Sequence, residues 1–230
     1  MDKNKDILLK RIARHLMLYS CFNHNIGLLN GKLGVVIFFY FYARYSKITY
    51  YDTFAGELLD EIYSEINVNN SVNFNDGLCG IGWGIDFLIR NKFVEGDVNE
   101  ILVDIDKTIF YRDIEIIIDD NLKFDFKGHV SYVINRNFND QKIFNKSYLL
   151  KLHDLLQSSL FSEDYEAFLL KEELANIIKG IPSVTRFCPL LNLIEKMDYN
   201  CNCIFNDKRP IGIENNGYTG IALNFLLMNK

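Results

Sequence analysis

The sequence predicts an all-α fold made of two layers of helices, and three observations lead to this prediction. A short glycine turn that opens an apolar, helix-like run recurs along the chain. Charged amphipathic segments lie between these turns. The composition, 49% hydrophobic and 24% charged over 230 residues, is typical of a globular chain long enough to bury one sizeable core.

The glycine phrase is clear in three places and fainter in two more. The clear copies read GKLGVVIFFYFYAR from Gly31, GLCGIGWGIDFLIR from Gly77 and GYTGIALNFLLMNK from Gly217, and the fainter ones read GHVSYVINR from Gly128 and GIPSVTRFCPLL from Gly180. A recurrence at about 40 to 50 residues indicates one supersecondary unit stacked several times. We therefore expect about five glycine-turn repeats.

The segments between the glycine phrases predict a second kind of helix. In YYDTFAGELLDEIYSEI, for example, Leu58, Ile62 and Ile66 keep helical spacing among charged residues. A run that is apolar on all sides is expected to be buried on all sides, so the amphipathic helices must form an outer layer around the apolar ones. This arrangement predicts an α/α toroid, closed or incomplete.

Composition also bounds the class of protein. No Pro/Ser-rich linker divides the chain, so we expect a single domain over residues 1–230. The longest apolar run, Leu33 to Ala43, is far shorter than the roughly 20 residues that span a bilayer, and the charged first twenty residues do not resemble a secretory signal. We expect a cytoplasmic protein without a transmembrane segment.

A net charge of −5 without a basic patch argues against a nucleic-acid partner. Five cysteines without an export signal favour thiols or ligands over disulfides.

Three phrases of the chain resemble the lanthionine synthetase C-like (LanC-like) family in its compact form. They are GLLNGKLGVVIFFYFYAR, AGELLDEIYSEI and FNDGLCGIGWGIDFLIRNKFVEGDV, and GYTGIALNFLL resembles the closing repeat of the family. The likeness is strong from about Gly27 to Asp106 and from about Pro210 to the end. It implies an α/α toroid whose central cavity binds a ribosomally made precursor peptide. In the family, a zinc ion there activates a peptide cysteine for addition to a dehydrated Ser or Thr, which forms a thioether ring.

The zinc ligands of the family do not appear in this chain. The resemblance implies a Trp/Cys-containing glycine motif and a Cys-His-Gly motif, each just before an inner helix. Asn215 and Asn216 precede Gly217, and Ile178 and Lys179 precede Gly180, where the Cys-His pair would stand. Neutral Asn side chains are poor zinc ligands, so we predict no metal or other cofactor at these positions.

A relocated zinc site is an alternative. Cys21 and His24 stand in Cys-x-x-His spacing before the first repeat, and Cys201 and Cys203 stand in Cys-x-Cys spacing before the last. The first and last units of a closed toroid touch, so these four groups could form a Cys₃His set. Free cysteines are more often small buried hydrophobic residues, and we favour that interpretation.

Other conspicuous residues have structural interpretations that we favour over functional ones. Cys79 stands at a helix start, where the pKa of a thiol can be lowered, but no histidine is near it in sequence to act as a base. We expect Asp76 to cap the following helix, Trp83 to lie in the core and His153 to be a surface or half-buried helix residue. His129 could line the cavity as an acid or base, although we favour a structural role in which it completes a degenerate copy of the repeat.

If the inner helices run in the same direction, their first turns gather at one mouth of the toroid. These turns lie around Asn30, Asp76, Lys127, Lys179 and Asn216. Free backbone N–H groups there would favour anionic or carbonyl-rich ligands such as an extended peptide.

The sequence thus predicts a LanC-like protein that binds a precursor peptide or a protein partner in a peptide-modification system, without zinc cyclase activity. The predicted peptide-binding residues are Asn30, Asp76, His129, Asn215 and Asn216, and no catalytic residue is assigned. Two rival classes stay open. One is a zinc-dependent thioether cyclase with a relocated metal site, and the other is a scaffold that docks a partner on outer-helix charges such as Glu57, Asp60 and Glu61.

Overall fold

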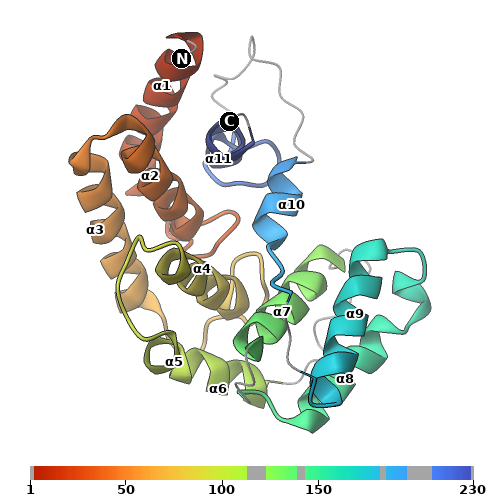
Figure 1. Ribbon diagram of the computed structural model, residues 1–230. Helices are drawn as coiled ribbons and strands as arrows, with labels where there is room; N and C mark the ends of the chain where they lie inside the picture. The colour runs from red at the N-terminus through yellow and green to blue at the C-terminus, as the bar shows by residue number, and fades with distance from the viewer. Residues whose placement is uncertain (1–2, 113–122, 139–142, 182–184, 196–208, 229–230) are drawn as a thin grey trace.

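The computed structural model describes residues 3–112, 123–138, 143–181, 185–195 and 209–228, and in this part of the chain it is all-helical, without a β-strand. Figure 1 shows the arrangement of the helices. In chain order they are α1 (Lys3–Ser20), α2 (Lys32–Ser46), α3 (Thr49–Glu65), α4 (Leu78–Arg90), α5 (Val98–Ile101), α6 (Val103–Tyr111), α7 (Lys123–Arg136), α8 (Lys146–Leu156), a 3₁₀ turn (Ser159–Phe161), α9 (Tyr165–Ile178), α10 (Pro189–Glu195) and α11 (Tyr218–Leu227).

The apolar helices are buried on all sides, as the sequence predicts. Every residue of α4 from Leu78 to Leu88 is buried, and so is every residue of α2 from Lys32 to Tyr40. Trp83 is fully buried in α4, and its indole N–H donates to the carbonyl of Phe187 at 3.4 Å. These helices therefore form the interior around which the other helices pack.

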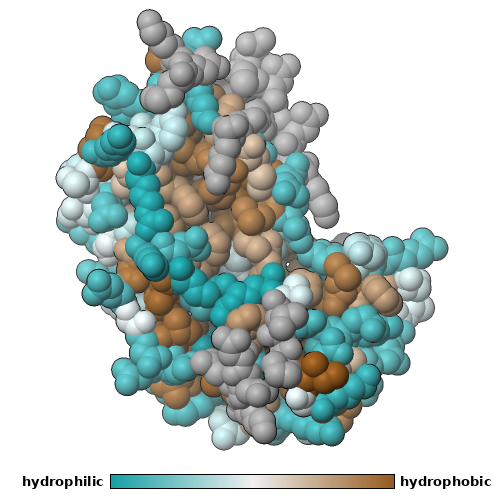
Figure 2. Space-filling model, viewed as in Figure 1, coloured by the Kyte–Doolittle hydropathy of each residue, from teal (hydrophilic) through white to brown (hydrophobic). Residues whose placement is uncertain are grey.

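Five helices form a set in which each helix contacts two of the others. α2 contacts α4 and α11, α7 contacts α4 and α10, and α10 contacts α11. The remaining longer helices lie outside them, with α1 on α2 and α11, α3 on α2, α6 on α4, α9 on α7, and α8 on α9 (Figure 1). Figure 2 shows hydrophobic side chains across the middle of the face in view, over the region of α2, α4 and α10, with hydrophilic ones around them.

The amphipathic segments form helices with one buried stripe. In α3, Leu58 and Ile62 are buried among exposed neighbours, as their spacing predicts, and Ile66 comes directly after the helix. His153 is half-buried in α8, also as expected. No helix in the described part of the chain is long and apolar enough to cross a membrane. The run DYNCNCIFNDKRP at 198–210, which shows no helical pattern in the sequence, lies almost wholly outside the described residues.

Two of the five glycine phrases do not begin a helix, so this part of the repeat prediction is wrong. Gly128 lies inside α7, where a Cβ would stand 2.2 Å from Cγ of Phe74, so its lack of a side chain lets α7 approach that ring. Gly180 follows α9 with φ of +79°. There its N–H bonds to Ile177 O at 3.0 Å and the N–H of Ile181 bonds to Asn176 O at 2.9 Å, which is a Schellman C-cap.

Candidate functional site

Three glycine-capped loops, residues 25–31, 71–77 and 210–217, lead into α2, α4 and α11, and we call them together the loop surface. Each glycine is the N-cap of its helix with φ between −65° and −114°, so no left-handed backbone requires it. Glycine is required because there is no room for a side chain: a Cβ at Gly77 would stand 2.4 Å from the carbonyl oxygen of Ser71. The loops therefore fold back tightly on the helices that they precede.

The first N–H groups of these helices are already bonded to their own loops. Lys32 N donates to Asn25 O and Leu78 N to Ser71 O, both at 2.8 Å, and Tyr218 N donates to Pro210 O at 2.9 Å. The expectation of free N–H groups that attract an anion is therefore wrong for the first residue of each helix. Lys179, which was expected at the same mouth, is instead the C-cap of α9.

Backbone hydrogen bonds join the three loops edge to edge. Leu29 N donates to Asn75 O at 2.8 Å, and Ile213 N donates to Leu29 O at 2.5 Å. α7 adds a carboxylate to this set, because Oδ1 of Asp125 accepts from both Phe74 N and Asn75 N at 2.8 Å. The repeat in the sequence thus becomes one continuous surface at the start of the inner helices.

Asn30 and Asp76, two of the predicted binding residues, lie together on this surface. Asp76 Oδ1 accepts from Asn30 N at 3.0 Å and Oδ2 accepts from Asn30 Nδ2 at 3.1 Å. Nδ2 of Asn30 also donates to Oε2 of Glu214 at 2.9 Å. Asp76 was expected to cap α4, but the cap is Gly77 without a side-chain hydrogen bond, so the carboxylate of Asp76 instead joins two loops.

Glu214 and Asp125 belong to this group, although sequence reasoning did not identify them. Asp125 is 1% exposed, and its Oδ2 has no hydrogen-bond partner in the part of the chain that the structure describes. Burial is the main cause that raises the pKa of this carboxyl above its ordinary value, with smaller contributions from the negative charges of Asp76 and Glu214. Only the folded arrangement brings the three carboxylates close, because they come from three separate parts of the chain.

The Asn215–Asn216 pair has a backbone explanation. Both residues are exposed and have positive φ, 53° and 54°, and Gly217 N donates to Glu214 O at 2.9 Å. This is a tight turn whose two central residues need the left-handed conformation that Asn tolerates. The pair therefore presents two exposed amides beside Glu214.

His129 is not exposed on the loop surface but lies in a buried group with Cys79 and Tyr148. Nδ1 of His129 is 3.1 Å from Sγ of Cys79, and Nε2 is 2.8 Å from the hydroxyl of Tyr148. His129 and Cys79 are each 0% exposed, so in this structure neither can touch a bound ligand. The structure thus supplies Cys79 with the histidine that its sequence neighbours lack.

Electrostatics keeps this buried group neutral. Burial raises the pKa of the Cys79 thiol well above its ordinary value, with smaller contributions from nearby acidic residues, and burial lowers the pKa of His129 to about 4. A nucleophilic cysteine needs the opposite shifts, toward thiolate and imidazolium. The arrangement has the distances of a catalytic pair without its charge state.

The alternative metal set is only partly described. Cys21 is exposed and its thiol lies 3.6 Å from Met17 O, and His24 is exposed in the loop that follows. Cys201 and Cys203 lie outside the described residues. Among the residues that are described, no group of three or more His, Cys, Asp or Glu side chains could hold a metal ion.

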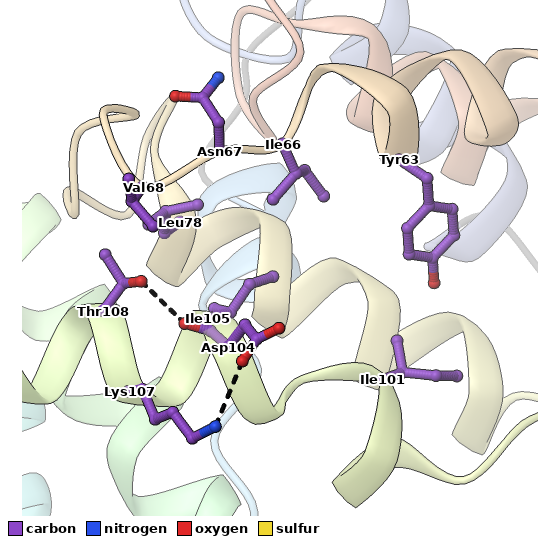
Figure 3. A pocket seen from close by; sticks show the side chains of 10 residues that line it. All are labelled: Tyr63, Ile66, Asn67, Val68, Leu78, Ile101, Asp104, Ile105, Lys107 and Thr108. Atoms are coloured by element: carbon purple, nitrogen blue, oxygen red, sulfur yellow. Dashed lines mark hydrogen bonds and ion pairs between the residues drawn. The ribbon is translucent and has the colours of Figure 1, made fainter.

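A pocket of about 440 Å³ lies between the end of α3 and α6, on the outer layer (Figure 3). Ile66, Leu78 and Ile105 line it with apolar side chains, and Asp104 and Lys107 form an ion pair at 3.3 Å among the lining residues. The loop surface differs from this pocket because its polar side chains are bonded to one another across the repeats.

A comparison of the chain with protein-family models, with curated proteins and with solved structures finds no match.

Proposed function

We propose that this chain is a LanC-like α/α toroid that binds a ribosomally made peptide, or a protein partner, in a peptide-modification system. The loop surface is the binding site in this proposal, and no zinc cyclase reaction takes place there. The resemblance of the glycine phrases to the LanC-like family supplies the class of ligand. The five helices α2, α4, α7, α10 and α11, each of which contacts two of the others, are compatible with the inner ring of such a toroid.

One observation supports the loop surface as the binding site. Three separate repeats contribute to a single hydrogen-bonded group in which Asn30 bridges Asp76 and Glu214. All three side chains are half-buried, so they are fixed in position and still open to solvent. An extended peptide is recognised by such fixed polar groups because it would otherwise lose the hydrogen bonds that it makes to water.

The residues at the expected zinc positions, and the burial of the Cys79–His129 pair, argue against cyclase activity. Asn215 and Asn216 form an exposed turn where the family would carry a Cys-His pair. Cys79 and His129 are close, but they are buried and neutral, and a thiol-activating centre must be open to the peptide cysteine. The metal content of purified protein tests this part directly. About one zinc per chain, lost in the Cys201→Ala/Cys203→Ala variant, would instead support the relocated cyclase site.

The binding proposal is tested by selecting ligands and locating where they bind. Peptides from a random twelve-residue phage-displayed library are selected on the wild-type protein, and hydrogen exchange is measured with and without the selected synthetic peptides. We expect slower exchange in residues 25–31, 71–77 and 210–217 and unchanged exchange in α3. Slower exchange confined to α3 and α6 would support the rival scaffold, and failure to select any binding peptide would overturn the proposal.

A further inference from the structure

The loop surface carries an excess of negative charge. Asp76 and Glu214 accept from the same amide nitrogen of Asn30, at 3.1 and 2.9 Å, so the two carboxylates stand on either side of one side chain. Asp125 lies directly beneath the loop through its bonds to Phe74 N and Asn75 N. In the described part of the chain, none of the three carboxylates forms an ion pair with a lysine, arginine or histidine.

The same place also holds two buried acceptor atoms that lack a donor. Oδ2 of Asp125, on a side chain that is 1% exposed, and Oδ1 of Asn75 are both buried and have no hydrogen-bond partner among the described residues. A buried acceptor without a donor is costly, and in native proteins such an atom commonly has a bound water or ion beside it. The amide oxygen of Asn75 makes this observation independent of the negative charge, and it calls for a group that donates hydrogen bonds.

The lysines at the inner helices do not supply that group. Nζ of Lys32, the first residue of α2, lies 2.8 Å from Glu61 and 3.4 Å from Glu65 at the outer helix α3. Nζ of Lys127 in α7 lies 2.8 Å from Asp164 and 2.7 Å from Glu166. Because both ammonium groups pair with outer carboxylates, these two lysines do not compensate the carboxylates of the loop surface.

We propose that the loop surface recognises a basic side chain, a lysine or arginine, in the peptide that it binds. This inference rests on the proposed function and names the chemical class of its ligand. The ammonium or guanidinium group donates hydrogen bonds to Asp76 and Glu214, whose negative charges no lysine, arginine or histidine in the described part of the chain compensates. A water molecule would satisfy Oδ2 of Asp125 but would leave the charges of Asp76 and Glu214 uncompensated.

The test uses two fluorescein-labelled ten-residue peptides of Gly and Ser that differ at four positions, which are all Lys in one and all Glu in the other. Binding to full-length protein is measured by fluorescence anisotropy at low and at physiological salt. The site variant is Asp76→Asn/Glu214→Gln. The control variant, Glu57→Gln/Asp60→Asn, removes the same charge from exposed positions of α3.

We expect the lysine peptide to bind wild-type protein at least tenfold more tightly than the glutamate peptide, and we expect the site variant, but not the control, to lose that preference. Circular dichroism establishes that both variants are folded, and Glu214→Gln alone replaces the double variant if it is not. An equal loss in both variants, or no preference for lysine, would overturn the inference. If peptides from the random library still protect the loop surface in that case, the proposed function stands and only its ligand class is wrong.

Discussion

Sγ of Cys79 lies 3.1 Å from Nδ1 of His129, although the two residues are 50 positions apart in the sequence. Cys79 stands in the first turn of α4 and His129 in the middle of α7, and these two helices pack against each other. The hydroxyl of Tyr148 from α8 completes the group on the other side of the imidazole. Since all three are buried, the group is expected to stabilise the fold in its neutral form.

The first prediction concerns the reactivity of Cys79. Because this thiol is 0% exposed and burial raises its pKa, we expect native protein to leave it unmodified by iodoacetamide at pH 7.5 while the exposed Cys21 reacts. Peptide mass spectrometry after timed labelling measures both sites in one sample, and labelling in urea is the control that makes both reactive. Rapid labelling of native Cys79 would mean that the site opens to solvent and would revive its role as a nucleophile.

The second prediction concerns the pH dependence of stability that His129 imposes. Its pKa is lowered from 6.5 to about 4 in the folded protein, so between these values the unfolded chain binds a proton that the folded chain does not. The free energy of unfolding should therefore fall as the pH decreases from 6.5 to about 4, by up to about 3 kcal/mol from this residue. Urea denaturation at several pH values measures the slope.

A pair of variants separates His129 from the other titrating groups. His129→Gln should flatten the profile between pH 6.5 and 4, whereas His24→Gln should keep the wild-type slope because His24 is exposed in the folded protein. A wild-type slope in the His129→Gln variant would show that the imidazole is protonated in the native state. That result would contradict the neutral group described above.

The sequence predicts the helical class and the buried layer because both depend on local patterns. GLCGIGWGIDFLIR reads as a buried helix whatever surrounds it, and α4 is such a helix. A glycine before apolar residues does not reveal what approaches it, so Gly128 was assigned to a turn although it makes room for Phe74 inside α7. The bonds from Asn30 to Asp76 and Glu214 join distant parts of the chain, and no local spacing identifies Glu214 as a member of the site.

The third prediction tests the tight loops of the repeat. Gly77→Ala places a Cβ at 2.4 Å from the backbone oxygen of Ser71, so the loop must shift, and we expect a loss of about 1 to 3 kcal/mol in the free energy of unfolding. Gly56→Ala is the matched control, because Gly56 lies inside α3 and its nearest neighbour, the Tyr40 hydroxyl, is 3.8 Å away. That variant should be more stable than the wild type, by up to about 1 kcal/mol. Equal stability of the two variants would mean that the loops need no close approach.

The fourth prediction concerns the buried ion pair at the end of α7. Nη2 of Arg136 lies 2.6 Å from Oδ2 of Asp106, both side chains are less than 9% exposed, and the Tyr132 hydroxyl donates to Oδ1 at 2.6 Å. Asp106→Asn leaves the guanidinium buried without a compensating charge, so we expect a loss of about 3 to 5 kcal/mol in the free energy of unfolding. Chemical denaturation of wild-type and variant protein measures this loss.

Helix α6, which carries Asp106, also supplies the control for this ion pair. Asp104 is 87% exposed and lies 3.3 Å from Nζ of Lys107, so Asp104→Asn removes the same charge from α6 where solvent screens the pair. We expect that variant to change the free energy of unfolding by less than about 1 kcal/mol. In Asp106→Asn/Arg136→Met the unpaired charge is gone, so part of the lost stability should return because the cost came from isolating Arg136 rather than from losing an attraction. A double variant less stable than Asp106→Asn would instead mean that the hydrogen bond from Arg136 to Asn99, at 3.1 Å, and the packing of the arginine stem dominate at this position.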